Sequence, residues 1–164
     1  MRNDKYVVVF DANIFLQALV SEGGPAVRCL EYFDQGKIHI AVSRATLAEV
    51  ADVLTRSHLR VKYSSLTDER VAQLLGRLRY KGIYVRKAPH RFFYSRDPND
   101  EPYLNLAIEV EADYLISRDN DLLDLMKWEQ EEGREFQQRF RFLKIVTPVE
   151  FLKVMESQTG QSND

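Results

Sequence analysis

An α/β fold, with a central, mainly parallel sheet of five strands flanked by helices, is predicted for this chain of 164 residues. Short apolar runs, typical of strands buried on both faces, alternate with segments of helical periodicity. This alternation indicates parallel pairing, because a parallel neighbour is reached through a crossover helix. Hydrophobic residues make up 45% of the chain and charged residues 29%, which suits one compact domain with a sizeable core.

The strands are expected at the apolar runs 6–10, 38–42, 83–86, 114–117 and 142–146. Helices are expected at 12–20, 25–35, 44–55, 68–80, 102–111, 122–131 and 149–156. No linker or internal repeat divides the chain, so we expect a single domain over 1–156. The polar tail 157–164 is expected to be disordered.

Net charge, cysteine content and hydropathy constrain the possible partners and the cellular location of the protein. The formal net charge of −2 gives no global electrostatic argument for nucleic acid, although a basic rim can accompany a local cluster of acids. Cys29 is the single cysteine and cannot form an internal disulfide. No leader and no long apolar run indicates export or membrane insertion, so a soluble, cytoplasmic protein is expected.

The first apolar run ends on an acid, because Tyr6 to Phe10 is followed by Asp11. Ligands of open α/β sheets bind in the crevice beyond the carboxyl ends of the strands, where Asp11 would lie. Aspartate is also a good N-cap, so Asp11 could instead serve only to start the next helix. Asn13 has the same two interpretations, as a polar group in the crevice or as an ordinary residue of the first helical turn.

Two further groups of acids stand at predicted helix starts. Asp119 and Asp121 follow the apolar run YLIS, and Asp97, Asp100 and Glu101 precede the helix expected at 102–111. Carboxylates brought together repel one another unless a proton or cation neutralises them, and a hard divalent metal with oxygen ligands does so. Each acid also has a purely structural interpretation, as a helix cap or as a favourable partner of the helix dipole.

Glu49 is the acid that periodicity does not single out. Its helix has an apolar stripe of Leu47, Val50, Ala51 and Leu54, and Glu49 lies off that stripe. The pattern alone therefore indicates a solvated surface acid.

Taken in order, these motifs resemble the PIN domain, a three-layer α/β fold of metal-dependent nucleases. The resemblance covers nearly the whole chain: VVFDANIF at the first strand, AVSRATLAEVADVL after the second, RDPNDEPYLNLAIEVEADYLISRDNDLL through the later acids and IVTPVEFL near the end. Within the family, the chain is most similar to the VapC-type toxins of bacterial toxin–antitoxin pairs.

The resemblance places the family's first aspartate on Asp11, its helix glutamate on Glu49 and its post-strand aspartates on Asp119 and Asp121. It also implies a supporting hydroxyl at the residue before the motif's last acids, and Ser117 stands there.

The third acid of the family has two candidates in this sequence. Counting back from LISRD places it on Glu101, a departure from the more common aspartate, while Asp100 beside it offers the shorter carboxylate. Register favours Glu101, and both remain candidates. Asp97 is interpreted as a turn residue.

By this resemblance, the protein hydrolyses RNA phosphodiester bonds with one or two Mg²⁺ or Mn²⁺ ions and needs no protein nucleophile. Asp11 and Asp119 would be direct ligands, and Asp121 would contribute to a second metal. Glu49 and either Glu101 or Asp100 would act through the metal or its waters. The resemblance also implies a homodimer and, for a toxin, a small antitoxin that blocks the acidic crevice.

RNA must approach such a site past basic and aromatic side chains, and the segment RKAPHRFFYSR is the candidate for that approach. The residues considered for phosphate contact are Arg86, Lys87, Arg91, Arg96 and, beside Asp119, Arg118. Phe92, Phe93 and Tyr94 are candidates for base stacking, or they cover an edge of the core. The run RFRFLKIV alternates as an edge strand does.

Other functional classes fit the sequence less well. A haloacid-dehalogenase-type phosphatase carries a second aspartate two residues after the first, where this chain has Asn13. A receiver domain has an acidic pair before its phospho-acceptor strand, whereas these acids are spread over helix starts. The remaining alternative is a PIN fold without catalysis that binds RNA or a partner as a scaffold, and the full set of acids argues against it.

Overall fold

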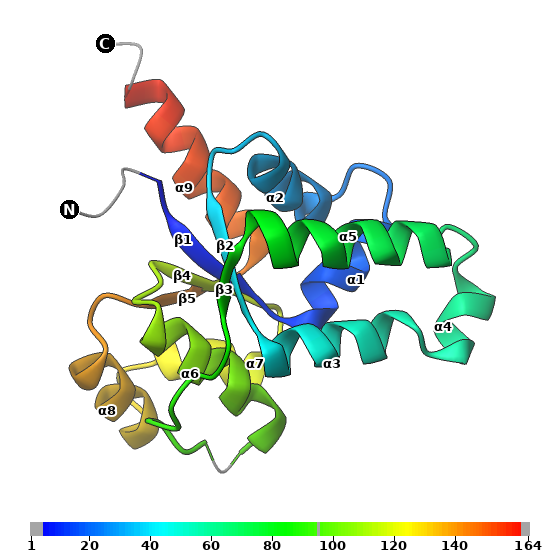
Figure 1. Ribbon diagram of the computed structural model, residues 1–164. Helices are drawn as coiled ribbons and strands as arrows, with labels where there is room; N and C mark the ends of the chain where they lie inside the picture. The colour runs from blue at the N-terminus through cyan, green and yellow to red at the C-terminus, as the bar shows by residue number, and fades with distance from the viewer. Residues whose placement is uncertain (1–4, 95, 162–164) are drawn as a thin grey trace.

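A parallel, five-stranded sheet with the order β3-β2-β1-β4-β5 forms the centre of the computed structural model, which describes residues 5–94 and 96–161 (Figure 1). The strands are β1 (Val7–Phe10), β2 (His39–Ser43), β3 (Ile83–Val85), β4 (Tyr114–Ile116) and β5 (Lys144–Val146). All strand pairs are parallel. The predicted α/β class and the positions of the strands are confirmed, with β5 on an edge as its alternating pattern indicated.

The helices connect the strands in chain order. They are α1 (Ala12–Val20), α2 (Pro25–Asp34), α3 (Arg44–Leu54), α4 (Ser57–Lys62), α5 (Asp68–Lys81), α6 (Glu101–Glu109), α7 (Asn120–Leu123), α8 (Glu131–Arg139) and α9 (Pro148–Gln161). Two short 3₁₀ turns, η1 (Pro98–Asp100) and η2 (Asp124–Met126), precede α6 and follow α7. None of the helices in the described part of the chain is long and apolar enough to cross a membrane.

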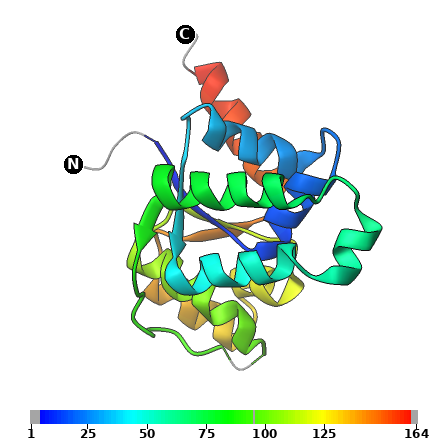
Figure 2. The ribbon, with the colours of Figure 1, turned by 45° about the vertical axis from the view of Figure 1, so that its right-hand side comes forward.

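Helices cover both faces of the sheet, which gives the three layers of the fold. Figures 1 and 2 show α1, α2, α5 and α9 on one side of the sheet and α6, α7 and α8 on the other. Right-handed crossovers account for this arrangement, because the chain runs from β1 outward to β3 and later from β4 outward to β5. Helix α3 lies at the carboxyl end of the strands and packs against α1, α5 and α6.

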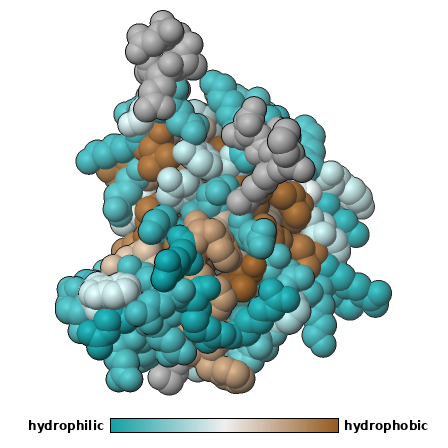
Figure 3. Space-filling model, turned by 90° about the vertical axis from the view of Figure 1, so that its left-hand side faces the viewer, coloured by the Kyte–Doolittle hydropathy of each residue, from teal (hydrophilic) through white to brown (hydrophobic). Residues whose placement is uncertain are grey.

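Burial on both faces explains why the strands could be predicted from the sequence as apolar runs. All residues of β1 are buried, and the β2 residues from Ile40 to Ser43 are buried as well. Strand β3, at the other edge, is only half-buried throughout. The side of the molecule drawn in Figure 3 shows hydrophobic residues gathered across the middle of a largely hydrophilic face.

The strand order changes direction at β1, since the chain moves to one side for β2 and β3 and to the other for β4 and β5. The crevice beyond the carboxyl ends of β1 and β4 is therefore the topological switch point, where open α/β sheets bind their ligands. Phe10 pairs with Ile116, and the Asp11 amide donates to the Ile116 carbonyl at 3.3 Å. This register brings the residues after both strands to the same crevice.

The prediction of a single helix at 122–131 is wrong. The chain leaves the helical conformation at Lys127, whose backbone is extended (φ −90°, ψ 111°), and α8 begins only at Glu131. Gly133 permits a close approach of α8 to this turn, because a Cβ there would lie 2.2 Å from the Lys127 carbonyl oxygen. The break allows Leu125 and Phe136 both to enter the core.

The last helix is longer than predicted. Helix α9 continues past Glu156 to Gln161, so the beginning of the tail expected to be disordered is helical, while 162–164 lies outside the described residues. Two contacts hold this part of the helix: an ion pair of Glu156 with Arg28 at 3.0 Å, and a hydrogen bond from Gln158 to the Tyr6 hydroxyl at 2.8 Å.

Candidate active site

Asp11 lies in the crevice and also caps α1. One carboxylate oxygen accepts the Ile14 amide hydrogen at 3.1 Å, and the other accepts a hydrogen bond from the Ser117 hydroxyl, from the end of β4. Asp11 is buried, with 6% of its surface exposed. The two interpretations left open by the sequence, crevice acid and helix cap, therefore hold together.

Ser117 joins the acids of the two strands. Its hydroxyl oxygen also accepts the Asp119 amide hydrogen at 2.9 Å. Asp119 in turn caps α7, through an Oδ1 that accepts the Asp121 amide hydrogen at 2.9 Å. The sequence around YLIS thus places a buried serine between two acids and orients both of them.

A cluster of three aspartates forms where α6 and α7 begin. Ligand oxygens of Asp97, Asp100 and Asp119 all lie within 4.8 Å of one another. Asp100 is buried, and its Oδ2 has no hydrogen-bond partner among the described residues. Unpartnered buried carboxylate oxygens in an acidic cluster are the donor set that hard divalent cations prefer.

The pKa values of Asp100 and Asp11 are raised. Burial is the main cause of the rise for Asp100, to about 8, and the neighbouring carboxylates Asp119, Asp97 and Asp11 add to it. Burial likewise raises the pKa of Asp11 to about 6, with the Ser117 and Ile14 hydrogen bonds acting in the opposite direction. The site therefore favours a positive charge or protons among its oxygens.

Glu49 approaches the cluster from α3 and is half-buried. Burial raises its pKa, and interaction with the Tyr103 hydroxyl lowers it, while Asp97 adds to the rise. The Tyr103 hydroxyl is buried and lacks a hydrogen bond of regular geometry among the described residues, so its contact with Glu49 is a loose one. Burial and Glu49 together raise the Tyr103 pKa. Periodicity alone indicated a solvated surface position for Glu49, but in the structure the residue is half-buried.

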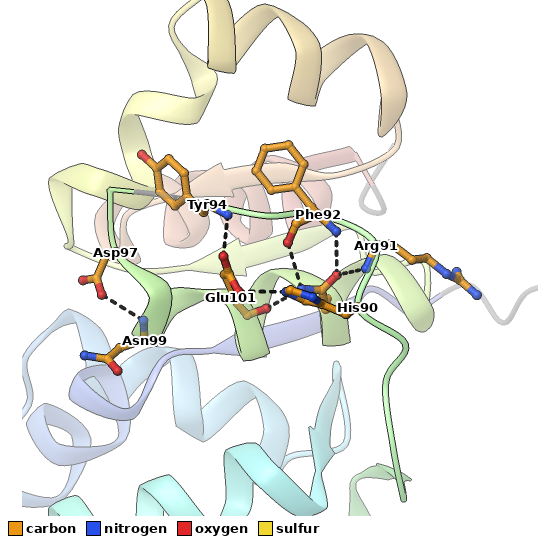
Figure 4. Close-up of polar contacts among 8 residues, drawn as sticks. His90, Arg91, Phe92, Tyr94, Asp97, Asn99 and Glu101 are labelled. Atoms are coloured by element: carbon orange, nitrogen blue, oxygen red, sulfur yellow. Dashed lines mark hydrogen bonds and ion pairs between the residues drawn. The ribbon is translucent and has the colours of Figure 1, made fainter.

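Glu101 does not belong to the cluster of three aspartates. Its carboxylate accepts the Tyr94 amide hydrogen at 2.6 Å and contacts His90 Nε2 at 2.8 Å, as the dashed lines in Figure 4 show. Asp97, on the other side of η1 in the same view, accepts the Asn99 amide hydrogen at 3.0 Å. Glu101 thus anchors the segment 90–94, and Asp100 is the acid that joins the cluster.

Asp121 and Asn13 act at this site through their backbone N–H groups, on Asp119 and on Asp11. The Asp121 carboxylate pairs with Arg96, which also pairs with Asp124 at 3.0 Å. The Asn13 side chain is exposed, and only its backbone N–H acts on Asp11.

Three of the arginines considered for RNA contact, Arg91, Arg96 and Arg118, are engaged within the protein. Arg96 holds two carboxylates, Arg91 pairs with Glu109 at 3.0 Å, and Arg118 donates to the Gln17 side chain. Of the three aromatics between them, Phe92 and Tyr94 are buried in the core and Phe93 is 75% exposed. The interpretation of Phe92 and Tyr94 as stacking residues is wrong, because both rings pack on the core side of the segment.

Two residues of the site were missed by reading the sequence. Asp97 was taken only as a turn residue, but it caps the short 3₁₀ turn that ends at Asp100, and both carboxylates join the cluster. Tyr103 lies on the sheet-facing side of α6, and no pattern distinguishes its buried hydroxyl from an ordinary core tyrosine.

The candidate site thus consists of Asp11 after β1, Glu49 on α3 and the aspartates at the starts of η1 and α7, at the switch point of the sheet. The chain belongs to the PIN domain family, whose model, described as PIN domain, matches residues 7–121. PIN domains are generally nucleases, and the family expected from the motifs is confirmed.

A relative of nearly the same length is found in an archaeon. The chain is 28% identical over 156 residues to the uncharacterized protein MJ1680 of Methanocaldococcus jannaschii. The match covers 95% of this chain and 96% of the relative.

Proposed function

We propose that the protein is a divalent-metal-dependent ribonuclease that hydrolyses RNA phosphodiester bonds. The observation that carries the proposal is the buried Asp100 carboxylate, whose Oδ2 is without a partner among the described residues inside a cluster of three aspartates. A buried, unpaired carboxylate is costly, and a hard cation held by several carboxylates compensates for that cost.

The proposed metal ligands are Asp100, Asp119 and Asp97, with Asp11 and Glu49 completing the ring of acids. Asp100 takes the place of the family's third acid in this proposal, because the Glu101 carboxylate is occupied by His90 and the Tyr94 amide. Asp121 is left out, since it pairs with Arg96. All proposed ligand atoms are carboxylate oxygens, which suits Mg²⁺ or Mn²⁺.

The chain's own residues would hold this site in order. Ser117 would link Asp11 to Asp119 and favour the charged form of Asp11, and the Tyr103 hydroxyl would interact with Glu49. A bound divalent ion would supply activation of water and screening of the phosphodiester charge. No serine, cysteine or histidine in the crevice is required as a nucleophile.

The finer assignments rest on the resemblance to VapC-type toxins. By that resemblance, the protein would be a cytoplasmic single domain over 1–156 that forms a homodimer and acts on RNA. A small antitoxin would cover the acidic crevice. Co-expression and growth assays with the neighbouring gene product as the partner test the toxin assignment directly.

The test of the proposed activity uses purified protein and a mixed panel of structured and single-stranded RNAs. Cleavage is followed with Mn²⁺, with Mg²⁺ and with chelator, for the wild type, for Asp119→Asn and for the control Glu22→Gln, an exposed acid outside the crevice. We expect metal-dependent cleavage that Asp119→Asn reduces at least about a hundredfold and Glu22→Gln leaves unchanged.

Two results would count against a metal nuclease. Cleavage that persists in chelator would remove the metal from the proposal. A folded wild type that neither binds Mn²⁺ nor cleaves any RNA would favour a non-catalytic scaffold.

A further inference from the structure

Two further acids, Asp121 on α7 and Asp124 at the end of that helix, lie next to the aspartate cluster. The Asp121 amide donates to Asp119 Oδ1 at 2.9 Å, which joins these two α7 acids to the cluster of Asp97, Asp100 and Asp119. Neighbouring carboxylates repel one another unless a cation neutralises them. Both groups of acids therefore require positive charge.

The cation of the α7 acids belongs to the protein itself. Arg96 donates from Nη2 to Asp121 Oδ1 at 2.5 Å and from Nη1 to Asp124 Oδ2 at 3.0 Å, so one guanidinium holds both carboxylates. Lys127 Nζ pairs with the other Asp124 oxygen at 2.8 Å. The hydrogen bonds from Lys127 and Arg96 lower the pKa of Asp124. The α7 acids are thus neutralised from within the chain.

Arg96 is held in place by its neighbours along the chain. Tyr94, two positions earlier, is buried, and its hydroxyl donates to the Asp121 carbonyl oxygen. Asp97, the next residue, caps η1 by accepting the Asn99 amide hydrogen at 3.0 Å, as Figure 4 shows. The main chain is therefore tied to α7 before Arg96 and to η1 after it, which keeps the guanidinium at Asp121.

The contacts of Arg96 form a network and not an isolated surface pair. The side chains of Arg96 and Asp121 are 37% and 33% exposed, and that of Asp124 only 16%. A planar guanidinium that bridges two carboxylates is held by charge-assisted hydrogen bonds at two of its nitrogens. A divalent ion on Asp121 would have to displace this group or lie in contact with its like charge.

We propose that Arg96 takes the place of a second metal ion, so that the site binds one divalent ion, at the cluster of three aspartates. The proposal rests on the proposed function, because it concerns the number of ions in the same site. In two-ion phosphodiesterases the second ion shares in stabilising the attacking and leaving oxygens. A guanidinium supplies a positive charge that neither dissociates nor yields to a chelator. Asp121, which the resemblance to the family made a ligand of a second metal, is instead a ligand of Arg96.

The test counts the ions that the purified chain binds. Mn²⁺ is titrated by calorimetry up to ~1 mM. Electron paramagnetic resonance then distinguishes a single Mn²⁺ from two neighbouring ions, which couple magnetically. The wild type is expected to bind one Mn²⁺ per chain. Arg96→Gln leaves the α7 acids with Lys127 alone, so this variant is expected to bind two ions with a coupled spectrum.

Three further variants isolate the role of the guanidinium. Arg77→Gln is the matched control, because Arg77 is 35% exposed and pairs with Asp34, 36% exposed, between α5 and α2. It removes the same charge and should bind one Mn²⁺. Arg96→Gln/Asp121→Asn should return to one ion, because the second ion loses a ligand. Arg96→Lys keeps the positive charge and should also bind one.

The role of Arg96 and the nuclease activity can fail separately. Two ions in the wild type would overturn the role of Arg96 and leave the nuclease standing if RNA is cleaved. One ion in Arg96→Gln, or two in Arg96→Lys or Arg77→Gln, would overturn it as well. One ion in the wild type and two in Arg96→Gln, without cleavage of any RNA, would support the role of Arg96 and overturn the nuclease. A wild type that binds no Mn²⁺ would overturn both.

Discussion

Ser117 and Asp11, at the ends of two adjacent strands, are joined by a hydrogen bond from the serine hydroxyl to Asp11 Oδ2. The same hydroxyl oxygen accepts the Asp119 amide hydrogen, so one side chain relates acids on two sides of the crevice. This hydrogen bond lowers the pKa of Asp11 against the burial that raises it. Ser117 therefore favours the charged form of Asp11, which is the form that binds metal.

Replacing Ser117 by alanine should weaken metal binding in a pH-dependent way. The pKa of Asp11 would rise further above its ordinary value, so more of Asp11 would be protonated at pH 7. We expect about tenfold weaker Mn²⁺ binding at pH 7 and a smaller loss at pH 8.5, measured by calorimetry. Ser65→Ala, a half-buried serine away from the crevice, serves as the control. An equal loss at both pH values would point to damaged packing instead.

The stability of the metal-free protein should fall as the pH rises. The pKa values of Asp11 and Asp100, about 6 and about 8, lie above their value of 3.8 in the unfolded chain. The unfolded state therefore releases these protons first, and stability decreases from pH 4 upward until both acids have titrated in the folded protein.

Asp100→Asn removes the larger part of this dependence. We expect the variant to be about 2 kcal/mol more stable than the wild type at pH 8 in chelator, and closer to it at pH 5. Urea unfolding at the two pH values measures the difference. Glu22→Gln should follow the wild type at both, and a wild type that gains stability from pH 5 to pH 8 would refute the assignment of the raised pKa.

Metal addition should stabilise the folded chain. A ligand present at a hundred times its Kd adds ~2.7 kcal/mol, which for a chain of this size raises Tm by ~5–10 °C. Thermal unfolding with Mn²⁺ and then with excess chelator should show the gain and its reversal. Asp100→Asn/Asp119→Asn should lose the gain, and an undiminished shift in that variant would place the metal elsewhere.

Glu101 can be tested separately as an anchor of 90–94. Glutamine at 101 keeps an oxygen for the Tyr94 amide, so Glu101→Gln should retain wild-type Mn²⁺ affinity and lose less than about 1 kcal/mol of stability. Glu101→Ala leaves the amide without its acceptor and should cost about 1–3 kcal/mol. Calorimetric Mn²⁺ titration and urea unfolding of both variants give the comparison. A loss of metal affinity in Glu101→Gln comparable to that in Asp100→Asn would make Glu101 a ligand.

The strands were predictable because parallel strands buried on both faces are continuous apolar runs, as in VVVF. Asp11 and Asp119 were predictable for a related reason, since the ends of such strands meet at one edge of the sheet. Helix α4 was not predicted, because it is short, has no fully buried residue and is held instead by contacts such as the ion pair between Arg60 and Asp68 at 2.6 Å.

The choice between Asp100 and Glu101 could not be made from spacing. Both stand at the start of one helix, and what separates them is a tertiary contact: the segment 90–94 returns along α6 and occupies the Glu101 carboxylate. The engagement of Arg96 with Asp121 and Asp124 is likewise a long-range contact. Neither contact leaves a periodic signal in the sequence.

The tie between Gln158 and Tyr6 places the end of α9 beside the start of β1. In Figure 1 both described ends of the chain lie at the amino end of the strands, opposite the acidic crevice. An affinity tag or a sensor-chip linker can therefore be attached to either end without covering the crevice. Surface immobilisation through such a tag leaves the acids open to metal and RNA in the flowing phase.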